Sequence, residues 1–205
     1  MSFFDIFQLA ALTFFLVVFL GRTVLLWLKQ GINPFALGTE KKGLHRLFEL
    51  ALFPWLVLWM LAILASTLHG PFRLIPVAWN PVLVNHLSMK IPGALLIVCG
   101  DFVFVWALIS FGNSWRVGID EKKAGTLVTG GVFAFSRNPI FVFLDLYFIG
   151  MFLINGTLVF LIFAGVTLLG IHYQILQEER FLAVKYGQEY REYRSRTGRY
   201  FGLKK

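Results

Sequence analysis

The sequence predicts an all-α, polytopic membrane helix bundle with about five transmembrane helices and a cytosolic amphipathic C-terminal helix. Composition is the first reason: 58% of the 205 residues are hydrophobic and the mean hydropathy is +0.72. A soluble domain of this length could not bury so much apolar surface. The other two reasons are a series of long apolar runs and the distribution of basic residues between them.

Four apolar segments are long enough, or nearly so, to cross roughly 30 Å of hydrocarbon as helices. They cover residues 3–28, 44–67, 91–111 and 157–176. A fifth run, residues 140–154, is shorter, but Asn155-Gly156 makes it one half of a tight hairpin with the last span. Between the second and third spans, prolines prevent residues 69–90 from forming a long helix, which predicts an interfacial loop on the outer side. We expect one domain, residues 1–205, with two spans and this loop in residues 1–90.

The basic residues divide unevenly between the two sides that five spans define. Only Arg73 and Lys90 lie on one side, and Arg22 lies within the first span toward the other side, where the first loop, the third loop and the tail carry the rest. Those residues are Lys29, Lys41, Lys42, Arg46, Arg116, Lys122, Lys123, Arg137, Arg180, Lys185, Arg191, Arg194, Arg196, Arg199, Lys204 and Lys205. The positive-inside rule therefore predicts an outer N-terminus and a cytoplasmic tail. Because the net charge of +8 lies beside membrane spans, it indicates membrane lipid as a partner and not nucleic acid.

The segment Ser136-Arg137-Asn138-Pro139 predicts a helix that begins at the proline. Arg137 and Asn138 would then lie at its N-terminus, where free backbone N–H groups and a guanidinium can hold a carboxylate or a phosphate. The loop before it is rich in glycine, which allows close approach to a ligand. A flexible connector and an arginine that snorkels to the interface are the simpler alternatives.

Glu178 and Glu179 come directly after the last span. Paired carboxylates beside lipid need cations, hydroxyls or water. Because both ends of the hairpin lie at one membrane face, we expect Arg137 to lie near them. Glutamates can accept the two hydroxyls of a ribose, and the arginine can hold a carboxylate. The alternative is an Arg137–glutamate ion pair that only fixes the hairpin.

His172 lies seven residues before Glu179, so the two share a helix face two turns apart. It could orient a substrate or accept a proton, although a structural role is the simpler interpretation. The other histidines, His45, His69 and His86, have no ligand spacing with cysteine or carboxylate, so we expect no metal site.

The tail carries an apolar, ring-rich stripe at helical spacing, formed by Leu182, Tyr186, Tyr190 and Tyr193. Gly187 is expected to end one short helix and to let a second begin. This amphipathic piece is either an anchor at the membrane interface or a cover for the site.

Three segments resemble the isoprenylcysteine carboxyl methyltransferase and phospholipid methyltransferase superfamily of integral membrane enzymes. They are FGNSW at residues 111–115, TLVTGGVFAFSRNP at 126–139 and QEERFLAVKYGQEYREY at 177–193. The resemblance covers about residues 91–201, with the motifs in order and at family-like spacing. The family's RHPxY reads RNPIF here, as in many bacterial-looking members, which points to a bacterial or archaeal inner membrane.

The resemblance implies S-adenosylmethionine as methyl donor, bound in a cytosolic pocket of residues 91–205. By resemblance, the cofactor-binding residues are Leu127, Val128, Gly131, Arg137, Asn138, Pro139, Glu178 and Glu179. Trp115 and Tyr190 offer aromatic faces to the positive sulfonium. We expect Arg137, Glu178 and His172 to be catalytic, with His172 or a glutamate as the base if the acceptor is an amine or a hydroxyl.

The predicted function is S-adenosylmethionine-dependent methylation of a lipophilic or prenylated substrate at the cytoplasmic membrane face, as in an isoprenylcysteine carboxyl methyltransferase. Gln174 stands where members that methylate a prenylcysteine carboxylate often carry arginine. A phospholipid (phosphatidylethanolamine) N-methyltransferase is therefore an alternative. An NADPH-dependent sterol or isoprenoid reductase and a non-catalytic membrane scaffold are the others. The sequence leaves open the methyl acceptor, the use of a general base and the oligomeric state.

Overall fold

A computed structural model describes residues 1–30, 44–68, 79–112 and 126–202, and within them the protein is an all-helical membrane bundle. The helices are α1 (Phe3–Gln30), α2 (Leu44–Thr67), α3 (Leu87–Phe111), α4 (Pro139–Asn155) and α5 (Leu158–Arg196), with a 3-10 helix, η3 (Gly131–Ala134). Four of them, α1, α2, α3 and α5, contain stretches long and apolar enough to cross a membrane, and α4 is a shorter apolar helix. The predicted fold class is confirmed, and the chain is an integral membrane protein.

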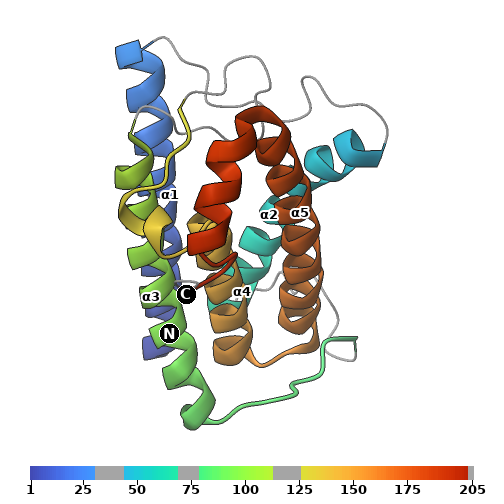
Figure 1. Cartoon of the computed structure of the whole chain (residues 1–205). Helices are drawn as coiled ribbons and strands as arrows, with labels where there is room; N and C mark the ends of the chain where they lie inside the picture. The colour runs from blue at the N-terminus through green and yellow to red at the C-terminus, as the bar shows by residue number, and fades with distance from the viewer. Residues whose placement is uncertain (31–43, 69–78, 113–125, 203–205) are drawn as a thin grey trace. The chain divides into compact units, whose positions relative to one another are not determined.

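The structure differs from the predicted elements mainly at α5. The apolar run ends at residue 176, but the helix continues to Arg196. The residues after 176 are good helix formers, so the change in composition marks the end of the apolar surface and not the end of the helix. Gly187 interrupts α5 with φ 52° and ψ −114°, which confirms the predicted break. Beyond it the chain turns back toward the start of α4 (Figure 1).

The chain forms two compact units, Met1–Leu74 with Gly112–Thr126, and Ile75–Phe111 with Leu127–Lys205. In the first unit, α1 and α2 contact each other. The start of α1 is closed by a reciprocal cap: the Ser2 amide donates to the Asp5 carboxylate at 2.6 Å, and the Asp5 amide donates to the Ser2 hydroxyl at 3.2 Å. Such a cap satisfies amide groups that have no partner in the first helical turn.

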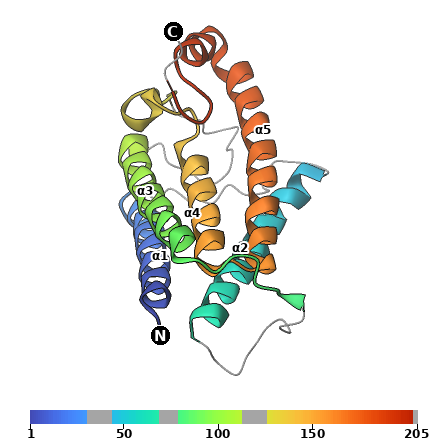
Figure 2. The ribbon, with the colours of Figure 1, turned by 90° about the horizontal axis from the view of Figure 1, so that it is seen from below.

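The second unit holds α3, η3, α4 and α5, and α4 lies between α3 and α5 (Figures 1 and 2). The α3–α4 contact is close because Gly100 packs against the backbone of Phe143. One turn further along α3, the Phe104 ring stacks on Phe143 with centroids 4.5 Å apart. Every candidate site residue that the structure describes lies in this unit, so α3 and α4 together form its framework.

The turn between α4 and α5 is held by the end of the loop that precedes α3. Leu83 and Val84 donate their amides to the Gly156 carbonyl at 2.7 and 3.0 Å, and the Leu158 amide donates to the Pro81 carbonyl at 3.1 Å. Gly156 has φ 62°, and a Cβ at this position would collide with the Val84 carbonyl. The predicted tight hairpin is therefore present, and only glycine fits at its corner.

Candidate functional site

An ion pair joins the start of α4 to α5. Arg137 Nη2 lies 2.7 Å from Glu179 Oε1, and Arg137 Nε donates to the same oxygen at 3.2 Å. The two side chains are 3% and 7% exposed, so both charges are withdrawn from solvent. Asn138, at the N-cap of α4, directs its Nδ2 to Glu179 Oε1 at 3.4 Å. The ion pair left open by the sequence is thus formed, and α4 begins at Pro139 as predicted.

A second arginine approaches the same carboxylate from the chain after α5. Arg199 Nη2 lies 3.0 Å from Glu179 Oε2, and Arg199 Nε donates to both carboxylate oxygens at 3.2 Å. These hydrogen bonds raise the pKa of Arg199 above its usual value, so its guanidinium remains charged. Glu179 therefore lies between two guanidinium groups, of which Arg199 is the more exposed, at 32%.

The same C-terminal segment surrounds Arg137 with backbone carbonyl groups. Arg137 Nη1 donates to the carbonyl oxygens of Arg194 and Thr197, each at 3.2 Å, and the Arg137 amide donates to the Gly198 carbonyl at 3.0 Å. Asn138 Nδ2 donates to the Arg199 carbonyl at 3.0 Å. The polar groups of Arg137 thus bind protein oxygens and hold the end of the chain against α4.

The tyrosine stripe of the tail packs on protein. Tyr190 and Tyr193 are buried in a cluster with Val132 and Phe133 of η3 and with Ala107 of α3. Leu127, Val128, Leu182 and Tyr186 pack against this cluster. The stripe therefore packs on the η3 segment, and its role as a cover for the site stays a prediction.

The two buried tyrosines differ in their hydrogen bonding. Tyr193 donates from its hydroxyl to the Phe133 carbonyl at 2.7 Å. The Tyr190 hydroxyl is buried and has no hydrogen-bond partner among the residues that the structure describes. Tyr190 lies on α5, as do Glu178 and Glu179, so the three residues belong to one helical element. An unpaired buried hydroxyl is costly, and a bound polar ligand is one way to satisfy it.

Gly131 has a local structural requirement of its own. Its φ is 61°, and a Cβ there would collide with the Ser110 side chain of α3. The Ser110 hydroxyl accepts a hydrogen bond from the Val132 amide at 3.2 Å. Gly131 thus allows η3 to approach α3 closely, which places Leu127 and Val128 beside the tyrosine cluster. Its predicted contact with a cofactor remains a prediction.

His172 belongs to a separate contact. Its Nδ1 lies 2.7 Å from the Tyr200 hydroxyl, and the two rings stack with centroids 6.2 Å apart. Partial burial raises the pKa of Tyr200, and the Asp145 carboxylate adds to the rise. His172 is exposed, and its hydrogen bond goes to Tyr200 and not to Arg137 or Glu179. The structure therefore ties His172 to the C-terminal segment and leaves its catalytic role a prediction.

Arg199 and Tyr200 were not singled out by the sequence analysis. The available signal was weak: Gly198 and Gly202 flank them and indicate a turn. The structure has this turn, with the Gly198 amide donating to the Gly202 carbonyl at 2.6 Å. Trp115, one of the predicted cofactor residues, lies outside the described residues. Within the described ranges, no group of three His, Cys, Asp or Glu side chains could hold a metal ion.

The unit that carries these contacts matches a known family. A family model described as phospholipid methyltransferase matches residues 89–189. Over this segment, the chain is similar to the phospholipid methyltransferase family. The match runs from α3 past the break at Gly187, so it includes Arg137 and Glu179 and ends before Tyr190 and Arg199. The superfamily resemblance is confirmed, and membrane methyl transfer is the supported activity class. A comparison with curated protein sequences found no match.

Proposed function

We propose that the protein transfers a methyl group from S-adenosylmethionine to a lipophilic acceptor at the cytoplasmic face of the membrane. The family match supports the methyltransferase class. The buried hydroxyl of Tyr190, which has no hydrogen-bond partner among the described residues, is the observation that carries the cofactor assignment. The basic residues of the tail and of the loop before α4 support the cytoplasmic face.

The residues around Tyr190 fit the chemistry of S-adenosylmethionine. The ribose hydroxyls and the ammonium group of the cofactor can donate hydrogen bonds to Glu178. The Tyr190 hydroxyl can donate to the carboxylate or to a ring nitrogen of the cofactor. Its sulfonium is positive and is attracted to aromatic faces, which Trp106, Phe111 and Tyr186 supply around the same cluster. When bound, the cofactor supplies a methyl group on a positively charged sulfonium sulfur, which becomes a neutral thioether after the transfer.

The chain's own contribution is alignment and the exclusion of water. The Arg137–Glu179–Arg199 contacts hold the start of α4, α5 and the C-terminal segment together. This fixes the tyrosine cluster against η3, and its apolar side chains keep water away from the cofactor region. Arg137 would therefore act by positioning, while Glu178 and Tyr190 would contact the cofactor.

Two acceptors fit this proposal, a prenylcysteine carboxylate and a phospholipid amine. A carboxylate needs no base, whereas a protonated amine must lose a proton before it can attack. His172 suits that task in the tautomer whose Nδ1–H donates to the Tyr200 hydroxyl, because Nε2 then has a lone pair that can accept a proton. The similarity to the phospholipid methyltransferase family supports the phospholipid as the acceptor.

The test is calorimetric binding of S-adenosylmethionine and S-adenosylhomocysteine to the detergent-purified full chain, with NADPH as the control ligand. Binding of the first two without NADPH supports the proposal. Binding of NADPH alone would support the reductase alternative instead. If no ligand binds even when lipid is present, the non-catalytic scaffold becomes the better explanation.

A further inference from the structure

The contacts around Glu179 leave a surplus of positive charge. Arg137 and Arg199 contribute two guanidinium groups, and Glu179 is the one carboxylate that bonds both of them in the described part of the chain. Arg137 is almost fully buried and its side-chain nitrogens bind protein oxygens. Arg199 is 32% exposed, so any anion that balances this charge must approach Arg199.

One edge of the Arg199 guanidinium is fixed and the other is available. Nε and Nη2 bind Glu179, whereas Nη1 has no hydrogen-bond partner among the residues described. A guanidinium held in this way loses little further conformational freedom when it binds an anion, because the Glu179 carboxylate already fixes its plane. Its remaining N–H groups can bind an oxyanion with charge-assisted hydrogen bonds.

The neighbouring contacts place Arg199 at the edge of the apolar surface. The next residue, Tyr200, bonds His172, which lies within the apolar part of α5. The Arg199 carbonyl accepts from Asn138, at the first turn of the apolar helix α4. The segment therefore lies where the apolar parts of α4 and α5 meet polar residues, the depth at which lipid headgroups are found.

We propose that Arg199 binds the phosphate of a lipid headgroup, with Glu179 as the residue that positions its guanidinium. A phosphodiester carries one negative charge, which would offset the surplus at this contact, and its oxygens match the arginine fork. The inference deepens the proposed function, on which it rests, because it makes a phosphate-bearing lipid the methyl acceptor. A lipid without a phosphate would lack this contact.

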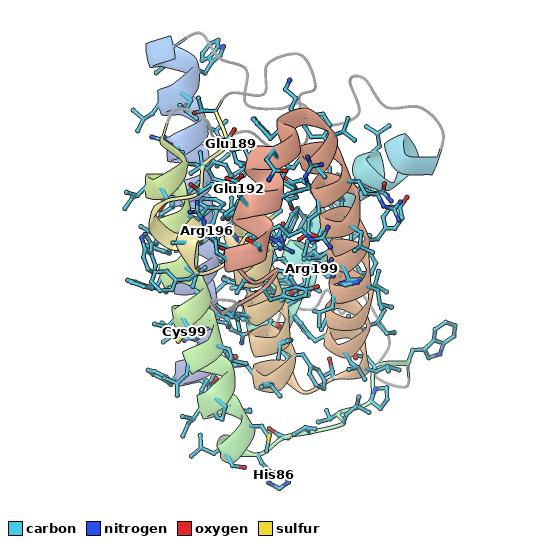
Figure 3. All side chains as sticks on the ribbon, viewed as in Figure 1. His86, Cys99, Glu189, Glu192, Arg196 and Arg199 are labelled. Carbon is cyan, nitrogen blue, oxygen red and sulfur yellow. The ribbon has the colours of Figure 1, made fainter. Side chains whose placement is uncertain are left out.

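The experiment measures binding of a short-chain phosphatidylethanolamine to the full chain in detergent by calorimetry. Arg199→Gln should weaken binding roughly tenfold or more, because it removes a charge-assisted hydrogen bond to phosphate. Arg196→Gln is the matched control, since Arg196 is exposed near the same end of the chain (Figure 3) and is not among the residues that bond Glu179 in the described structure. An unchanged dissociation constant for Arg199→Gln, or an equal loss for Arg196→Gln, would overturn the proposal.

Other probes identify the source of the anion. A diacylglycerol of the same chain length, which lacks phosphate, should bind equally to the wild type and to Arg199→Gln. Inorganic phosphate should compete with the lipid weakly, since it lacks the apolar chains. If phosphate alone binds as tightly as the lipid, the site takes free phosphate and the lipid assignment is wrong. If a prenylcysteine loses affinity in Arg199→Gln and the phospholipid does not, Arg199 binds a carboxylate instead.

Two further measurements separate the possible failures. If Arg199→Gln does not fold, Arg199→Lys tests the proposal in its place, because lysine keeps the charge opposite Glu179 but lacks the planar guanidinium. A folded Arg199→Lys with weaker lipid binding supports the proposal, and one with unchanged binding overturns it. S-adenosylmethionine binding is measured on the same samples. If the wild type does not bind S-adenosylmethionine, the proposed function is wrong. If it does bind S-adenosylmethionine but Arg199→Gln binds the lipid as tightly as the wild type does, only this inference is wrong.

Discussion

Gly93 of α3 and Gly150 of α4 face each other where the backbones of the two helices lie close together. A Cβ on Gly93 would lie 2.8 Å from the Gly150 carbonyl oxygen, and a Cβ on Gly150 would lie 2.6 Å from the Gly93 carbonyl oxygen. Small residues allow this approach between membrane helices, where packing and not hydrophobic burial favours association. The contact fixes α4, which begins directly after Arg137 and its N-cap residue Asn138.

Gly150→Ala is therefore expected to destabilise the protein by about 1–3 kcal/mol, because the added methyl group would overlap both the Gly93 carbonyl and the Ile97 side chain. The free energy of unfolding in a denaturing detergent measures the change. Gly165→Ala is the matched control in α5, since nothing lies within 4 Å of a Cβ there. It should leave stability unchanged or slightly higher, because alanine favours helix. Equal effects of the two substitutions would contradict the close packing.

Arg137→Ala should destabilise the protein more than Arg199→Ala, although both arginines bind Glu179. Removing Arg137 leaves the buried carboxylate with Arg199 as its charged partner and takes the donor from the Arg194 and Thr197 carbonyls. Breaking such a pair costs roughly 3–5 kcal/mol. Arg199 is partly exposed, so its contribution should be about 1 kcal/mol or less. The free energies of unfolding of the two variants and of the double variant test this order, and equal losses would be inconsistent with it.

The hairpin that brings Arg137 to Glu179 could be predicted from sequence. Proline after Ser136-Arg137-Asn138 marked the start of α4, and two apolar runs joined by Asn155-Gly156 placed both ends at one face. Arg199 could not be predicted in the same way. It reaches Glu179 only because the chain reverses at Gly187, and the direction of a reversal depends on backbone dihedral angles that residue periodicity does not contain.

The tyrosine stripe illustrates a second limit. Helical spacing indicated that Tyr190 and Tyr193 share a face, and both are buried together. Spacing did not decide whether that face meets lipid or protein, because apolar side chains suit both. The surface they cover is η3, a short helix that depends on the positive φ of Gly131 and on its contact with Ser110. Such a pairing of distant segments is visible only in the folded chain.

Gly187→Ala is expected to destabilise the C-terminal segment by about 1–3 kcal/mol, since its φ and ψ lie in a region that only glycine adopts readily. The cost comes from the backbone alone, because nothing lies within 4 Å of a Cβ at this position. Gly187→Asn should not restore stability, since asparagine tolerates the left-handed helical region and ψ −114° lies outside it.

The free energy of unfolding and the hydrogen exchange of residues 188–196 measure the effect of the Gly187 variants. Gly130→Ala is the control, because Gly130 has φ −95° and an equally open environment. It should change neither quantity. Unchanged protection of residues 188–196 in Gly187→Ala would mean that the reversal does not depend on this glycine.

Tyr190→Phe and Tyr193→Phe remove the same atom from two neighbouring buried rings, with opposite expected results. Tyr193→Phe takes the donor from the buried Phe133 carbonyl and should cost about 1–3 kcal/mol of stability. Tyr190→Phe removes a buried hydroxyl without a partner in the described structure, so stability should stay the same or rise. If that hydroxyl binds S-adenosylmethionine, affinity for the cofactor should fall roughly three- to tenfold in Tyr190→Phe.

Calorimetry and thermal unfolding of the same two variants give both quantities, and the combination distinguishes the possible roles of the hydroxyl. If the hydroxyl binds only the cofactor, its removal lowers the affinity for the cofactor and leaves the stability of the free protein unchanged. A hydroxyl satisfied by an ordered water would lower stability when removed and leave affinity unchanged. Loss of affinity in Tyr193→Phe alone would instead place the cofactor at the η3 carbonyl and remove Tyr190 from the site.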